Sequence, residues 1–458
     1  MSPVYSLDDK ILVTWLKANY KDIEFISKKL DYEMHRRTQE LQDSIDALEE
    51  SQDLYKQQEA VPRLWRNLLG KAIVYLKFKD DREEYHDDAD YGVERLNKFL
   101  AAFHEFEYIL YGAGVERYRD HVAHQLSVFL IGEYLIRNTF KFSDISVTEK
   151  PTEYENIEKS ILSEEKEAMW CIMALTHDLG IPLERITDIN PIAEKMLKEF
   201  GLINTEGISF PATPQPLDDF VLRLISSDIR KVQKDGEVGY ITHLQPKYYM
   251  KFSEAYERRD HGVISCSVLL KNLVFFLETD YSLDKDVPLD LQDAKQFLVR
   301  SNILRAIASH SNDNIYYVKI PQFRFLLRIC DEMHEWGRPR LISMFGGTNL
   351  IPKVTINKFT NEEIDYQVVF ECTSDKASLS RNEKEKIKKQ IRKYFKDKCE
   401  RIITILRSAV GGKDRKLKLS IMVKNTLNPR EIFTIIHSNP QSIQTLKAGK
   451  SFQLDDIS

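Results

Sequence analysis

Histidines and aspartates that follow apolar stretches are the residues of this sequence with the clearest capacity for chemistry. His177 and Asp178 come directly after MWCIMALT, and Asp331 follows RFLLRIC. A carboxylate that emerges from a buried helix needs a cation or hydrogen-bond donors, because an unpaired buried charge is costly. A divalent metal would satisfy both carboxylates, and imidazole nitrogens are suitable further ligands.

Three more histidines lie in apolar helical patterns. His124 is followed by apolar residues four, seven and eleven positions later, which places it on one helix face with them. His310 follows isoleucines three and seven positions before it, and His261 opens the apolar segment HGVISCSVLL. We therefore expect several imidazoles and two carboxylates to converge inside one helical bundle.

These segments resemble a known enzyme family when they are taken in order. RDHVAHQLSV, ALTHDLG, RRDHGVISCSVLL, AIASH and FLLRICDEMHEWGRP look like the HD superfamily of metal-dependent phosphohydrolases, over roughly the middle half of the chain. The family pattern of one His, a His-Asp pair and a distant Asp falls on His124, His177-Asp178 and Asp331. Subfamilies that hold two metals add two histidines, which His261 and His310 match. The G-Y-P segment of the HD-GYP subfamily does not occur in the sequence.

The resemblance implies one or two divalent transition-metal ions, Mn, Fe, Co, Ni or Zn. The implied metal ligands are His124, His177, Asp178, His261, His310 and Asp331. Asp178, His177 and His261 are the implied catalytic residues, with water activated by the metal and Asp178 as the bridge of a two-ion site. Since His121 and His124 lie three residues apart on one helix face, either could be the first ligand, and the family spacing favours His124.

Arginines near the metal motifs are candidates for binding the substrate phosphate. The candidate arginines are Arg119, Arg259, Arg328 and Arg338. For each of them the alternative is a solvated charge at a helix end.

The reaction expected from these residues is hydrolysis of a phosphoester bond in a nucleotide or a nucleotide-like phosphorylated small molecule. One alternative is an HD-type nuclease, marked by a continuous basic face between the site and the C-terminal basic helix. Another is a non-catalytic metal- or nucleotide-binding sensor or scaffold. Nucleic acid is the less favoured partner, because the net charge of −5 provides no strong positive field.

The elements that position these residues are expected to be mainly α-helical and divided into three parts. Residues 1–103 should form long amphipathic helices, capped first by Ser6 and Asp9 and arranged as a helical hairpin or a dimer arm for homo-oligomers. Residues 104–347 should form an all-helical HD-type core, with 201–246 as a flap or insertion. Residues 348–458 should form a small α/β (α+β) domain.

The C-terminal part combines two kinds of pattern. VTINKF, IDYQVVFECT and KLKLSIMVK are typical of strands, and EKEKIKKQIRKYFKDKCERIITILRS is typical of a long basic helix. The basic helix could contact nucleic acid or a phosphorylated ligand, but a charge-rich exposed helix is the favoured interpretation.

Composition limits the class of protein. The 458 residues predict two or three domains, and 42% hydrophobic with 30% charged residues is typical of a folded globular chain. The five cysteines are scattered and form no C-x-x-C pair, which favours a reduced, cytoplasmic setting. The sequence has no basic segment followed by an apolar one at its N-terminus and no apolar stretch of about 20 residues, so we expect neither export nor a membrane span. P-loop, G-x-S-x-G and G-x-G-x-x-G motifs do not occur.

Overall fold

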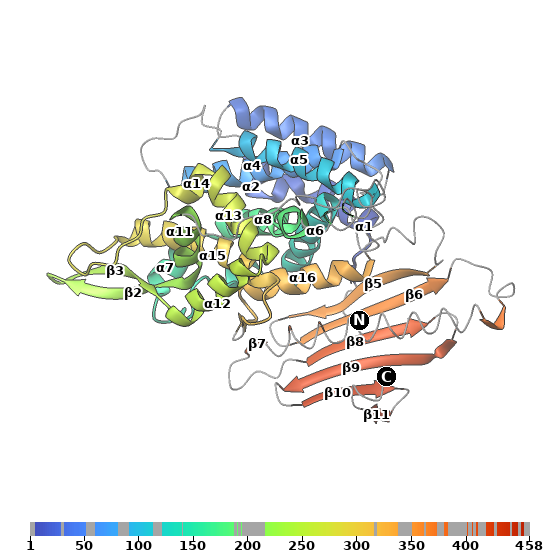
Figure 1. Cartoon of the computed structure of the whole chain (residues 1–458). Helices are drawn as coiled ribbons and strands as arrows, with labels where there is room; N and C mark the ends of the chain where they lie inside the picture. Colours follow the sequence, from blue (N-terminus) through green and yellow to red (C-terminus); the bar gives the residue numbers. More distant parts are fainter. Residues whose placement is uncertain are drawn as a thin grey trace.

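The structure of the protein is a computed structural model. It describes residues 5–28, 32–51, 60–80, 91–112, 121–139, 141–186, 190, 194, 216–315, 318–337, 350–360, 363–372, 380–382, 401, 405, 409–410, 418–425, 428–439, 442–447 and 450–452. Over these ranges the chain is mainly α-helical with a smaller β part (Figure 1), as predicted.

The helices of the first part of the chain are α1 (Asp9–Asn19), η1 (Tyr20–Asp22), α2 (Glu24–Ser27), α3 (Tyr32–Ser51), α4 (Ala60–Asp80), α5 (Val93–Gly112), α6 (His121–Thr139), η3 (Phe142–Asp144), α7 (Glu155–Ser160), α8 (Ser163–Thr176) and α9 (Ile181–Arg185). The later helices are α11 (Pro216–Ser226), α12 (Pro246–Glu257), α13 (His261–Asn272), α14 (Val274–Leu277), α15 (Leu291–His310) and α16 (Phe323–Gly337).

The strands are β1 (Tyr5–Ser6), β2 (Ser227–Lys234), β3 (Glu237–Leu244), β4 (Val318–Lys319), β5 (Leu350–Phe359), β6 (Glu363–Cys372), β7 (Ala409–Val410), β8 (Lys418–Asn425), β9 (Asn428–Asn439), β10 (Ser442–Lys447) and β11 (Lys450–Phe452). The main sheet has the order β1-β5-β6-β8-β9-β10-β11. β6 and β8 are parallel, and the other neighbours whose register is defined are antiparallel.

Helix α8 forms the centre of the helical core. Every residue from Glu165 to Thr176 is buried, and α8 packs against α4, α6 and α15. A helix that is covered on all sides needs apolar residues around its whole circumference, as the AMWCIMAL segment provides. His177 is the C-cap of α8, so the packing of this helix fixes the His-Asp pair.

Helices α6 and α8 approach closely at a glycine. A Cβ atom on Gly132 would lie 1.9 Å from Cζ2 of Trp170, whose Nε1 donates a hydrogen bond to the Phe129 carbonyl. Because the indole is fully buried, it has no room to move away. Gly132 therefore sets the distance between the helix that carries His124 and the helix that ends at His177.

Two sequence expectations need correction. The N-cap of α1 is Asp8, whose carboxylate accepts from the Lys10 amide, so the capping box of Ser6 and Asp9 was wrong. The middle of the chain is not all-helical, because β2 and β3 form an antiparallel hairpin. The stretch taken as a flap is thus partly α11 and this hairpin, which projects on the side of the molecule away from the main sheet (Figure 1).

Other expectations agree with the structure. Helices α3 and α4 pack against each other, which confirms the helical hairpin for this segment, while a homo-oligomer contact stays a prediction. The three C-terminal segments expected as strands are β5, β6 and β8. The expected basic helix lies outside the described residues except for Arg401 and Ile405, which are helical. Among the described residues, no helix is both long and apolar enough to span a bilayer.

Replacing Gly132 by alanine should destabilise the protein, because the added methyl group collides with Trp170. We expect the free energy of unfolding to fall by about 1–3 kcal/mol, measured by urea denaturation. The matched control is Gly70→Ala in α4, where the new Cβ meets only the end of the Arg37 side chain. Equal stability of the two variants would contradict this account of the α6–α8 contact.

Candidate metal centre

The described helices bring the predicted ligand residues to one place. His177 and Asp178 follow α8, His310 is the last residue of α15, and His261 is the first residue of α13. His124 lies in the first turns of α6, and Asp331 lies within α16. All six side chains are buried except His261, which is 23% exposed.

One group of ligand atoms surrounds Oδ2 of Asp178. Nε2 of His124 lies 3.5 Å from this oxygen and 3.0 Å from Oδ1 of Asp331. Nε2 of His177 lies 3.6 Å from Oδ2 of Asp178 and 3.9 Å from Oδ1 of Asp331. Donor atoms at about 2.1 Å from one shared ion lie about 3.0–3.4 Å apart, so these separations are close to those of a coordination shell.

A second group faces the other oxygen of the same carboxylate. Nε2 of His310 lies 3.4 Å from Oδ1 of Asp178, and Nε2 of His261 lies 3.6 Å from it. The two Nε2 atoms lie 3.2 Å apart. Asp178 thus stands between two groups of imidazoles, one at each carboxylate oxygen.

The Nδ1 atoms of these histidines are oriented by neighbouring groups. Nδ1 of His177 lies 2.9 Å from the Ala174 carbonyl, and Nδ1 of His310 lies 2.6 Å from the Ile307 carbonyl. A carbonyl only accepts, so Nδ1 carries the proton and Nε2 presents its lone pair to the centre. Metal-binding histidines in proteins are held in this way.

Outer contacts also orient the other two imidazoles. Nδ1 of His261 lies 3.0 Å from Oε2 of Glu184 in α9. Nδ1 of His124 lies 2.6 Å from Nδ1 of His334, so one of these two rings carries the proton between them. His334 is buried, and its ring centroid lies 4.8 Å from that of His124.

The approach of α13 to the His-Asp pair depends on Gly180 and Ser265. The Ser265 hydroxyl donates to the His177 carbonyl and accepts from the Gly180 amide, both at 2.7 Å. A Cβ on Gly180 would lie 2.2 Å from the His261 carbonyl oxygen, so any larger residue would force α13 away. This contact holds His261 beside Asp178.

The electrostatics of the cluster are suited to a cation. Burial lowers the pKa of His177 to about 4, so its imidazole is neutral at pH 7. Burial alone would raise the pKa of both aspartates. The surrounding histidines nevertheless hold the pKa of Asp178 well below its usual range, and His124 and Arg401 do the same for the pKa of Asp331. Nε2 of His177 is buried without a hydrogen bond and faces two carboxylate oxygens. Because this nitrogen and the carboxylate oxygens are all hydrogen-bond acceptors, a bound cation fits between them. A mixed set of nitrogen and oxygen ligands suits a divalent transition metal.

The structure separates the two candidates for the first ligand. His124 belongs to a group of ligand atoms with His177 and Asp331, within 4.8 Å of one another. His121 is buried at the start of α6, and its ring centroid lies 6.0 Å from that of Phe103. The geometry thus brings His124 together with His177 and Asp331, and His124 is the residue that the family spacing favoured.

Two of the four predicted phosphate-binding arginines, Arg259 and Arg328, lie within the described residues. Arg328 is buried, and its guanidinium donates to the carbonyls of Ser309, Asn312 and Ile315 at the end of α15. Its geometry indicates a structural role rather than phosphate binding. Arg259 is partly buried in the turn before α13, with a φ of 60°. Arg119 and Arg338 lie outside the described residues.

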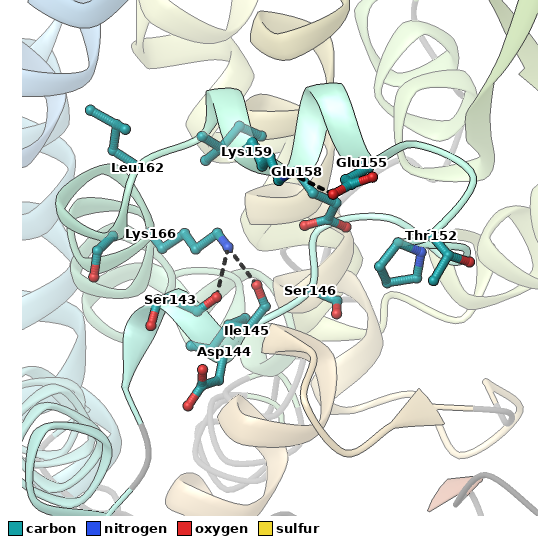
Figure 2. A pocket seen from close by; sticks show the side chains of 13 residues that line it. Ser143, Asp144, Ile145, Ser146, Thr152, Glu155, Glu158, Lys159, Leu162 and Lys166 are labelled. Carbon is teal, nitrogen blue, oxygen red and sulfur yellow. Dashed lines mark hydrogen bonds and ion pairs between the residues drawn. The ribbon is translucent and has the colours of Figure 1, made fainter.

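A separate cavity of about 640 Å³ lies at the opposite end of α8 (Figure 2). Helix α8 has 14 residues and is therefore about 21 Å long, so its length separates the cavity from the His-Asp pair. Lys166 points into it, but its Nζ already donates to the carbonyls of Ile145 and Ser143, at 2.7 and 3.4 Å. None of the candidate metal ligands lines this cavity.

Two residues at the cluster were missed by sequence reasoning. Glu184 lies 77 residues before its partner His261, and Arg401 lies 70 residues after its partner Asp331. The signal for Glu184 was weak, namely an acid six residues after the His-Asp pair. Arg401 was one of many basic residues in a charge-rich segment.

Comparison with known protein families, with curated proteins and with solved structures finds no match. The chemistry of the cluster is therefore inferred from its own geometry. That geometry shows buried His/Asp groups that could hold a metal ion.

Substituting His177 by alanine should lower the metal content of the purified protein, because it removes the buried Nε2 between the two aspartates. We expect at least one equivalent of a divalent transition metal in the unaltered protein and less than half of that in the variant, measured by plasma mass spectrometry. The control is His243→Ala on the hairpin, where the imidazole contacts Arg230 instead. Equal metal content in both variants would remove His177 from the ligand set.

Proposed function

We propose that this protein is a metal-dependent phosphohydrolase of the HD type, which hydrolyses a phosphoester bond of a nucleotide or nucleotide-like small molecule. The observation that carries the proposal is the position of Asp178 between two imidazole groups, one at each oxygen. One carboxylate with two ligand groups is suited to a pair of ions. The resemblance of the five sequence segments to the HD superfamily supports the same reaction class.

His124, His177, Asp331 and Oδ2 of Asp178 would hold the first ion. His261, His310 and Oδ1 of Asp178 would hold the second. Bound in these positions, divalent ions lower the pKa of water and neutralise charge that develops on a phosphoryl group. The buried walls of α6, α8, α15 and α16 exclude bulk water around these ligands, which strengthens each electrostatic contact.

The reaction is a hydrolysis with a simple balance. The oxygen of a water molecule forms a new bond to phosphorus, the bond between phosphorus and the ester oxygen breaks, and the leaving alcohol takes up a proton. The carbonyl contacts at Nδ1 of His177 and His310 keep both rings in one tautomer and direct their Nε2 atoms to the centre. The protein thus contributes a preorganised site that needs no rearrangement of its ligands.

Turnover should depend on Asp178, because it belongs to both ligand groups. We expect the unaltered protein with added Mn²⁺ or Co²⁺ to release phosphate or nucleoside from members of a nucleotide panel. Asp178→Asn should lower kcat by at least about 100-fold. Asp219→Asn in α11 is the matched control, since this carboxylate binds Tyr249 and Arg223. Protein that holds metal but turns over no phosphoester would favour a binding or sensor role instead.

The affinity for the second ion should increase with pH. Burial alone would lower the pKa of His261. Contacts with Glu184 and Asp178, with a contribution from Asp260, raise this pKa to about 9. His261 is then protonated at pH 7 and must lose a proton to bind metal. We expect the affinity to increase up to about tenfold per pH unit between pH 7 and 9 and then to level off.

Isothermal titration with Mn²⁺ in buffers of different ionisation enthalpy would measure this proton release. Glu184→Gln removes the charge that supports the protonated imidazole, so the affinity should level off at a lower pH. An identical pH profile for this variant would show that Glu184 does not set the protonation of His261.

A further inference from the structure

The connection between β6 and β8 reaches the candidate metal centre. These strands are parallel neighbours, so the chain between them must cross over from one end of the sheet to the other. Arg401 belongs to this crossover, and its Nη2 lies 3.3 Å from Oδ2 of Asp331. Its Nε lies 2.7 Å from Oε2 of the buried Glu332. A residue from the C-terminal part thus contacts a candidate metal ligand of the helical core.

The crossover is tied to the helical core at further points. Ile405, one helical turn after Arg401, is buried. Four residues later, β7 pairs in parallel with β4, with Val318 opposite Ala409 and Lys319 opposite Val410. Strand β4 lies between α15, which ends at His310, and α16, which carries Asp331. These contacts position the guanidinium beside the cluster.

The guanidinium of Arg401 has the exposure that a ligand-binding group needs. Its side chain is 51% exposed, whereas Asp331 and Glu332 are almost completely buried. Nε and Nη2 face the two carboxylates, and a guanidinium has five N–H donors in a planar fork suited to phosphate oxygens. Arg328, in contrast, is buried and donates to backbone carbonyls.

The contact also orients Asp331. Oδ2 of this carboxylate faces Arg401, which leaves Oδ1 directed to Nε2 of His124 at 3.0 Å. Arg401 can therefore fix the ligand oxygen with Nη2, while its half-exposed side chain offers further N–H donors. A phosphate bound at the cluster would lie next to these donors.

We propose that Arg401 binds a phosphate oxygen of the substrate. This inference rests on the proposed phosphohydrolase function. It assigns to the C-terminal part a direct contribution to substrate binding. It also supplies a positive partner for the phosphate, whereas the guanidinium of Arg328 is turned to backbone carbonyls.

The experiment uses full-length protein loaded with Mn²⁺ and inorganic phosphate as the probe. Isothermal titration would compare the unaltered protein with Arg401→Gln, Arg401→Lys and Arg223→Gln. Arg223 is the matched control, because it is 46% exposed and paired with Asp219 away from the cluster. Metal content by plasma mass spectrometry and steady-state kinetics on the best nucleotide substrate complete the comparison.

We expect Arg401→Gln to weaken phosphate binding about 10- to 100-fold, as for the loss of a charged hydrogen bond, with unchanged metal content. KM should rise more than kcat falls. Arg401→Lys should restore part of the affinity, and Arg223→Gln should match the unaltered protein.

If Arg401→Gln bound phosphate as tightly as Arg223→Gln does, the inference would be overturned. Metal binding and turnover by the unaltered protein would still support the proposed function in that case. Loss of metal from Arg401→Gln would also overturn it, because the guanidinium would then act only through Asp331. If the unaltered protein held no metal or hydrolysed no phosphoester, the proposed function itself would fail, and the inference with it.

Discussion

The burial of Asp178 and Asp331 among four histidines is the interaction on which the rest of the structure depends. Two carboxylates inside a helical core cost several kcal/mol unless a positive charge accompanies them. The Nε2 atoms of the surrounding histidines face these carboxylates, so the cluster could hold a metal ion. The arrangement of α6, α8, α13, α15 and α16 follows from this requirement, because each helix places a ligand at the same point.

The sequence predicted that these histidines and aspartates would lie together, because they are attached to strong local patterns. His177 and Asp178 follow an apolar segment that had to be a buried helix, and His310 ends another. Helical periodicity gives the direction of a side chain from residues a few positions away. The mainly α-helical fold and the C-terminal strands β5, β6 and β8 followed from the same kind of local pattern.

Features that depend on distant contacts could not be predicted in this way. The pairing of His334 with His124 joins residues 210 positions apart, and nothing near His334 indicates its partner. The hairpin of β2 and β3 was hidden because LDDFVLRLISSDIRKVQKDGEVGY offers both helical and strand patterns, with only Asp235-Gly236 to mark the turn. The exposed Arg401 was indistinguishable by sequence from its basic neighbours.

The pairing of β1 with β5 has a consequence for the order in which the chain folds. Tyr5 lies opposite Ile356, and the Leu7 amide continues the ladder by donating to the Val354 carbonyl. During synthesis the N-terminal strand must therefore wait until more than three hundred further residues have been made. Contacts of such long sequence separation form late, because loop closure precedes any gain from them. Strand β1 can thus pair with β5 only after the helical core, which lies between the two strands in the sequence, has emerged from the ribosome.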